Sequence, residues 1–293
     1  MRKPSRTKKS RNMTKNRLIP LALVFLTLIV LIILLSCDWQ YISDQQKANN
    51  FKSSQEIEFL VQKAKLTDKG KTILYASSPQ LKDKSSFNAT CGKDGDPDVY
   101  IAGCHYKIDD NEFIDIYNAG KDATSLQKSY YNYENAKIVT LAHEMMHAVY
   151  SRIPQSEKEK IWEELNKIYM SNEELRSEIS LYPEDEQMDE LYVRVATEIY
   201  GISSFLEKHY GEYFKDRRYI AKLYHDNKTQ IKNMFAEVDI ILQKMEAQKS
   251  IYKNATDYYV QRDAINEYNR LVDLYNARIE VYGEVKSKLD SEK

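Results

Sequence analysis

The stretch KIVTLAHEMMHAVYSRI, residues 137–153, carries two histidines four positions apart, His143 and His147, with Glu144 directly after the first. On an α-helix, positions i and i+4 lie on the same face, so both imidazoles can reach one metal ion. Glu144 lies about 100° further round the helix, where it misses the ligand shell but can take a proton from a bound water. This spacing is the HExxH pattern of zinc sites. The other faces of the stretch are apolar, so we predict a buried helix.

A catalytic zinc ion takes three protein ligands and keeps a fourth position open for water. No third histidine follows at short spacing, because the next ones are His209 and His225. We therefore turn to the predicted helix 190–214, where Glu190 and Glu198 lie within about 80° of the same face. We favour Glu198, because it lies among apolar residues, where a buried carboxylate is costly unless it meets a cation. Glu190 is the alternative, in an acid-rich stretch that water can reach.

The N-terminus combines a basic segment with an apolar one. Residues 1–17 hold eight Lys and Arg and no acidic residue, and residues 18–37 run apolar as far as Cys37. Such a run can cross a bilayer core of about 30 Å, and the basic flank favours the cytoplasmic side. We predict a membrane anchor that places the rest of the chain outside the cytoplasm. The alternative is a lipoprotein-type signal, because LLSC at 34–37 resembles a lipobox with Cys37 as the lipidated residue.

Cys91 and Cys104 remain as a natural pair for a disulfide bond in an oxidising compartment. Such a bond would close a short loop and stabilise the fold by roughly 3 kcal/mol. Two unpaired thiols are the alternative, because the sequence does not give the distance between them.

The whole chain predicts an α+β fold that is mostly helical. After the anchor, residues 38–54 are polar and are interpreted as a linker, and residues 55–216 as one domain with a small sheet ahead of the HExxH helix. Residues 217–293 repeat apolar positions at alternating spacings of three and four, which is typical of a coiled-coil seam. Because residues 249–257 interrupt this register, we expect an antiparallel helical hairpin.

Three β-prone runs supply the expected sheet, at residues 71–78, 98–103 and 112–118. EFIDIYN, residues 112–118, is the nearest candidate for the edge strand of this sheet, and a plain scaffold strand is the alternative. An extended peptide can pair with such an edge by β-augmentation.

Five pieces of the chain together resemble the gluzincin class of zinc metallopeptidases, and the wider arrangement resembles a family of bacterial membrane-anchored envelope proteins. The pieces, between about residues 90 and 283, are CG…GCHY, VTLAHEMMHAVYSRI, VATEI, LEKHYGEYFKDRRYI and EYNRLVDLYNARIEVY. The resemblance implies a zinc-dependent hydrolase domain followed by a helical hairpin. Together with the residue chemistry, it predicts Zn²⁺ held by His143, His147 and Glu198, with Glu144 as the general base for peptide-bond hydrolysis.

The expected protein is therefore a membrane-anchored, extracytoplasmic zinc peptidase that cleaves envelope or extracellular proteins. The alternative is a non-catalytic envelope scaffold that binds a protein partner through the hairpin, with a structural metal or none. Glu144 favours the enzyme, because a structural zinc site has no use for a carboxylate beside its ligand. The formal charge of −1 provides no basic field for nucleic acid, so no such partner is expected.

Overall fold

The computed structural model describes residues 39–91 and 102–285. The predicted basic segment and membrane anchor, residues 1–37, lie outside these ranges. Within them, no helix is both long and apolar enough to cross a bilayer.

The chain divides into two compact units, Met1–Gln46 and Lys47–Lys293. Residues 39–50, within the predicted linker 38–54, are helical. All the elements described below belong to the second unit.

A three-stranded sheet has the order β1–β3–β2. β1 (Pro79–Lys82) runs parallel to β3 (Asn111–Tyr117), and β2 (Gly103–Ile108) runs antiparallel to it. β3 is therefore the central strand, and the expectation that residues 112–118 form an edge is wrong. Its alternating Ile114 and Ile116 are fully buried, as expected for a strand paired on both sides.

The first expected strand, residues 71–78, is helical for most of its length. Helix α3 (Asp68–Ala76) begins after Thr67, whose side chain accepts a hydrogen bond from the backbone N–H of Gly70. The apolar residues that suggested a strand, among them Leu74, instead form the buried face of this helix. An N-terminal cap and tertiary burial here outweigh β-propensity.

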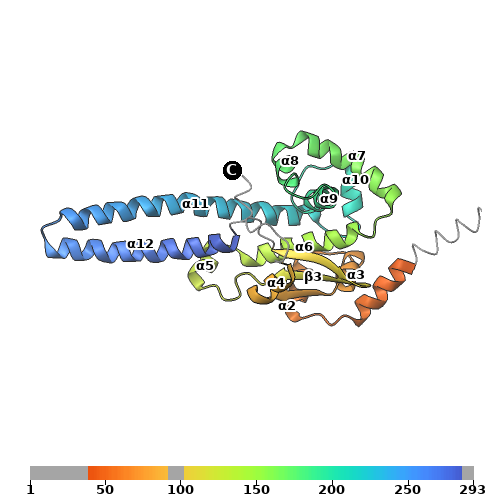
Figure 1. Cartoon of the computed structure of the whole chain (residues 1–293), viewed down its shortest axis with the longest axis horizontal. Coiled ribbons are helices and arrows are strands. Elements are labelled where there is room, and N and C mark those ends of the chain that lie inside the picture. Colours follow the sequence, from red (N-terminus) through yellow and green to blue (C-terminus); the bar gives the residue numbers. More distant parts are fainter. Residues whose placement is uncertain (1–38, 92–101, 286–293) are drawn as a thin grey trace, which may run out of the picture. The chain divides into compact units, whose positions relative to one another are not determined.

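Helix α6 (Tyr133–Tyr150) lies at the centre of the unit. It packs against β2 and β3 of the sheet and against the helices α9 (Gln187–Thr197) and α11 (Arg217–Asn254) (Figure 1). The predicted buried helix is confirmed. Five of its apolar side chains have no exposed surface: Leu141, Ala142, Met145, Met146 and Ala148. Shorter elements complete the unit: α2 (Gln55–Lys63), α4 (Lys84–Cys91), α5 (Ser125–Tyr130), α7 (Gln155–Ser171), α8 (Glu173–Ile179) and α10 (Ser204–Tyr210).

The predicted helical hairpin is confirmed. α11 (Arg217–Asn254) and α12 (Tyr258–Val285) run antiparallel, joined by residues 255–257 (Figure 1). Near the far end of α12, Val281 is fully buried in a cluster with Ile231 and Met234 of α11 and with Tyr131 and Tyr133. The beginning of α11 belongs to the main core through Ile220 and Leu223, so the hairpin continues the domain without a break at residue 217.

Candidate metal centre

Two helices bring three donor atoms together. His143 and His147 lie on one face of α6, with their Nε2 atoms 3.3 Å apart. In the first turn of α9, Oε2 of Glu190 lies 3.7 Å from Nε2 of His143 and 3.5 Å from Nε2 of His147. The side chains of Glu190 and of two histidines that lie 43 and 47 positions before it in the chain thus converge on one point.

These separations suit a zinc ion. Tetrahedral zinc with bonds of about 2.0–2.1 Å holds its ligand atoms roughly 3.3 Å from one another. The donor atoms of His143, His147 and Glu190, at 3.3–3.7 Å, are already close to that spacing. Two imidazoles and one carboxylate are also the ligands of catalytic zinc sites that leave a fourth position open for water. Both the geometry and the chemistry of the donor set therefore fit Zn²⁺.

Glu190, and not Glu198, is the carboxylate that meets the histidines. Glu190 is only 4% exposed, although its acid-rich surroundings suggested contact with water. Glu198 lies eight positions further on, about 12 Å along the helix axis. It caps the C-terminus of α9, and α10 begins at Ser204, so the predicted helix 190–214 is interrupted there. The cation expected beside buried Glu198 is Arg194, whose Nη1 lies 3.4 Å from its Oε2.

Arg194 also orients Glu190. Its Nε donates a 2.7 Å hydrogen bond to Oε1 of Glu190, which leaves Oε2 directed at the two histidines. Its Nη1 pairs with Glu178 on α8. Burial alone would raise the pKa of Glu190, but the charge of His143, hydrogen bonds to both histidines and the charge of Arg194 hold that pKa well below its usual value. Glu190 therefore presents an ionised oxygen to the centre.

Asp189, which was not predicted from the sequence, contacts the ring nitrogen of His147 that does not face the other donors. Its Oδ1 lies 3.0 Å from Nδ1 of His147. Burial would lower the pKa of His147, but the hydrogen bonds to Asp189 and Glu190 raise it well above its usual value. Because Nδ1 contacts Asp189, Nε2 is the nitrogen that faces the donor set and would bind a metal in place of its proton, as is common for histidine ligands. The signal was present in the sequence as a second acid directly before Glu190.

Glu144 lies beside the donor set, as predicted, and not within it. It is 5% exposed, and burial raises the pKa of its carboxyl group against the opposing charges of His143 and His147. The first residue of β2, Gly103, covers it. A Cβ atom at Gly103 would stand 2.6 Å from Cγ of Glu144 and 2.6 Å from Cγ2 of Thr140. Only glycine allows the strand to approach the helix this closely.

The predicted disulfide bond joins Cys91 at the end of α4 to Cys104 in β2. Because neighbouring residues of a strand point to opposite faces, Cys104 lies on the face of the sheet opposite to that of Gly103. The bond therefore fastens α4 to the face of β2 that is turned away from α6.

Comparisons with protein-family models, with curated proteins and with solved structures return no match to this chain. The interpretation of the centre therefore depends on the positions and chemistry of its own side chains. The likeness to gluzincins stays a likeness of short motifs.

Proposed function

We propose that this protein is a zinc-dependent peptidase of the gluzincin type. The observation that carries the proposal is the convergence of the His143, His147 and Glu190 donor atoms at 3.3–3.7 Å beside the buried carboxyl of Glu144. A site that only stabilised the fold would need the three donors but not the fourth carboxyl. We also propose that the segment at residues 18–37 anchors the protein in a bacterial membrane, with the peptidase unit outside the cytoplasm.

Each residue of the centre has a separate task in peptide hydrolysis. When bound, zinc supplies a Lewis acid that polarises the scissile carbonyl and acidifies water. Glu144 accepts the proton of the attacking water and later gives it to the leaving amine. Burial, which raises the pKa of Glu144, favours retention of that proton between the two steps. Asp189 and Arg194 fix the orientations of His147 and Glu190.

The position of β2 supports a peptide as the substrate. Among the described residues β2 pairs only with β3, so its other edge can accept an extended chain by β-augmentation. Gly103 brings the start of this strand against Glu144. A peptide that paired with β2 would therefore pass close to the general base. Residues 112–118, expected earlier to have this role, are in the centre of the sheet.

The decisive experiment is the replacement Glu144→Gln in the full-length chain. The amide keeps the size of the side chain but cannot accept a proton, so zinc content should stay near one ion per chain. Cleavage of a mixed peptide library should fall by about 10²-fold or more, in line with the loss of general-base assistance. Glu134→Gln, at an exposed position of the same helix, is the matched control and should cleave as the wild type does.

Two results would count against the proposal. Full activity of Glu144→Gln would exclude Glu144 as the base. A wild-type protein that carries zinc but cleaves no peptide of the library or of the host envelope would favour the scaffold instead.

The hairpin provides the observation that favours the second candidate function, a partner-binding scaffold. Around the turn at residues 255–257, large apolar and aromatic side chains are exposed, and Tyr258 and Tyr259 are 70% and 63% exposed. Tyrosine is enriched in protein interfaces. A photocrosslinker at Tyr258 tests this role in intact cells, with one at exposed Glu163 on α7 as control. A crosslinked partner specific to Tyr258 would support it, and equal patterns at both positions would not.

A further inference from the structure

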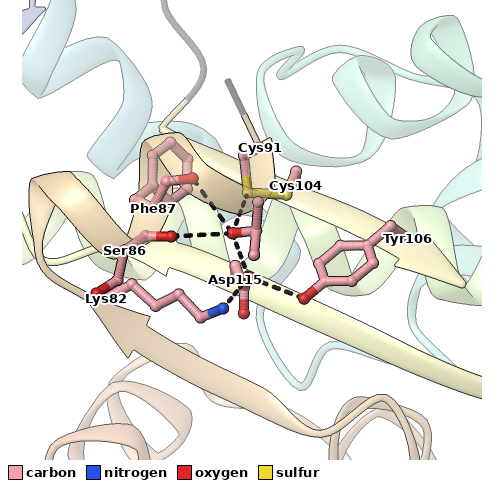
Figure 2. The surroundings of a disulfide bond; sticks show 8 residues. Lys82, Ser86, Phe87, Cys91, Cys104, Tyr106 and Asp115 are labelled. Carbon is pink, nitrogen blue, oxygen red and sulfur yellow. Dashed lines mark hydrogen bonds and ion pairs between the residues drawn. A yellow bond between two sulfur atoms is a disulfide. The ribbon is translucent and has the colours of Figure 1, made fainter. Parts of the chain in front are cut away.

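The disulfide bond is surrounded by polar groups that a purely structural bond does not require. Asp115, opposite Cys104 on the neighbouring strand β3, has no exposed surface. One of its carboxylate oxygens and the two sulfur atoms all lie within 4.8 Å of one another. Figure 2 shows the disulfide, Lys82 and Tyr106 grouped around this carboxylate. A buried carboxylate is costly, so its position beside the sulfurs calls for a reason.

Three groups contact the same oxygen of Asp115, and one of them leads to the disulfide. Nζ of Lys82 lies 2.6 Å from Oδ2, and the hydroxyl of Tyr106 donates to it at 3.0 Å. The hydroxyl of Thr90 donates to Oδ2 at 2.8 Å and is 3.7 Å from Sγ of Cys91. Thr90 therefore connects the sulfur of Cys91 to the buried carboxylate through a single hydroxyl group.

Among the described residues, none donates a hydrogen bond to the second oxygen of Asp115. Within the described part of the chain, Oδ1 is buried and has no hydrogen-bond partner. The ion pair with Lys82 explains the charge of Asp115 but not this free acceptor. A cysteine thiol carries an S–H donor that the disulfide lacks. Opening of the bond would therefore supply, close to a carboxylate oxygen that lies within 4.8 Å of both sulfur atoms, the kind of donor that the described residues of the oxidised protein do not offer to Oδ1.

We propose that Cys91 and Cys104 form a redox-active pair that exchanges with external thiols and disulfides, with Asp115 as the proton acceptor for Cys91 through Thr90. Both cysteines are partly exposed, so a small thiol can reach them. This activity is independent of the peptidase proposed above, because the two sites lie on opposite faces of β2.

The closing reaction shows what each residue does. In the half-reduced protein, Cys104 is in a mixed disulfide with a small thiol, such as glutathione, and Cys91 is a free thiol. Cys91 gives its proton to the oxygen of Thr90 while the Thr90 hydroxyl gives its own proton to Asp115. The Cys91 thiolate attacks Sγ of Cys104, the new S–S bond forms, and the bond to the small thiol breaks. The small thiol leaves as a thiolate and takes up one proton from the solvent. Asp115 then releases its proton to the solvent, so no net proton is consumed.

Closure of the bond in the full-length protein tests this proposal. The protein is reduced with dithiothreitol, transferred to oxidised glutathione, and quenched with an alkylating reagent for mass spectrometry, at pH values from 6 to 9. We expect Asp115→Asn and Thr90→Val to close at least tenfold more slowly than wild type at pH 7. The difference should shrink toward pH 9, where the Cys91 thiol ionises without help. Thr72→Val on α3 makes the same change as Thr90→Val at a hydroxyl that donates to the carbonyl of Asp68, so it is the matched control and should stay within twofold.

The outcomes separate a redox role from a structural one. If both variants close at the wild-type rate at pH 7, or are slowed by the same factor at every pH, Asp115 is not the proton acceptor. Failure of dithiothreitol to open the bond in the folded protein would also overturn the proposal. Thr90→Val retains the Asp115–Lys82 ion pair, so it serves as the test even if Asp115→Asn does not fold.

Discussion

Replacement of Glu190 by glutamine should remove most of the zinc affinity, whereas the same replacement at Glu198 should leave it almost intact. The two substitutions are well matched. Both residues are 4% exposed, both pair with Arg194, and both changes delete one negative charge. They differ in their distance from the donor atoms of the histidines, so their comparison isolates ligation from general electrostatic support.

The expected difference follows from distance. A carboxylate bonded at about 2 Å to a dication gains about 4 kcal/mol even at the dielectric constant of water, which is roughly 10³ in affinity. The same charge about 12 Å away, as for Glu198, gains about 0.7 kcal/mol, roughly threefold, and salt screens part of it. The glutamine at 190 retains a carbonyl oxygen that binds weakly. We therefore expect a loss of at least about 10²-fold for Glu190→Gln and of less than tenfold for Glu198→Gln.

Competition with a chelator of known affinity measures both variants, and circular dichroism shows whether each remains folded. The reasoning would be refuted if Glu198→Gln lost zinc while Glu190→Gln kept it. Equal losses in the two variants would mean that the Arg194 network as a whole, and not ligation by Glu190, controls the affinity.

Three further predictions concern other parts of the fold. A methyl group at Gly103 would meet Glu144, so Gly103→Ala should lower peptidase activity by about tenfold or more with zinc retained; activity within twofold of wild type would contradict this contact. Burial lowers the pKa of His209 from its usual 6.5, so the folded state resists its protonation and the free energy of unfolding should fall as the pH drops below about 6.5. Urea titrations from pH 5 to 7.5 should show a weaker pH dependence in His209→Gln, and an unchanged dependence would assign it elsewhere. Val281→Ala should cost about 2 kcal/mol in a single unfolding transition, and a separate transition for the hairpin would contradict its continuity with the domain.

Local patterns were enough to predict α6 and the hairpin. The spacing of His143 and His147 depends only on the period of one helix, and the apolar repeats of α11 and α12 need only each other. Composition was a weaker guide for the residues of α3, which have strand-like apolar content but follow the capping residue Thr67. A short apolar run fits either a strand or a helix until its neighbours in space are known.

The third donor could not be chosen from the sequence. Glu190 and Glu198 lie within about 80° of one face, and both are buried and both meet a cation. A buried carboxylate does need a positive partner. For Glu198 that partner is the guanidinium group of Arg194, so its burial does not require a metal ion.

By itself, the sequence determined the helix that carries His143, Glu144 and His147, because helical spacing is a property of neighbouring residues. Only the tertiary structure decided which turn of α9 faces that helix, which strand lies in the centre of the sheet, and that Gly103 covers Glu144. These features depend on how separate elements pack, and packing is set by the shapes of side chains that are distant in the chain. A local pattern can therefore name the chemistry of the centre but cannot complete its set of donors.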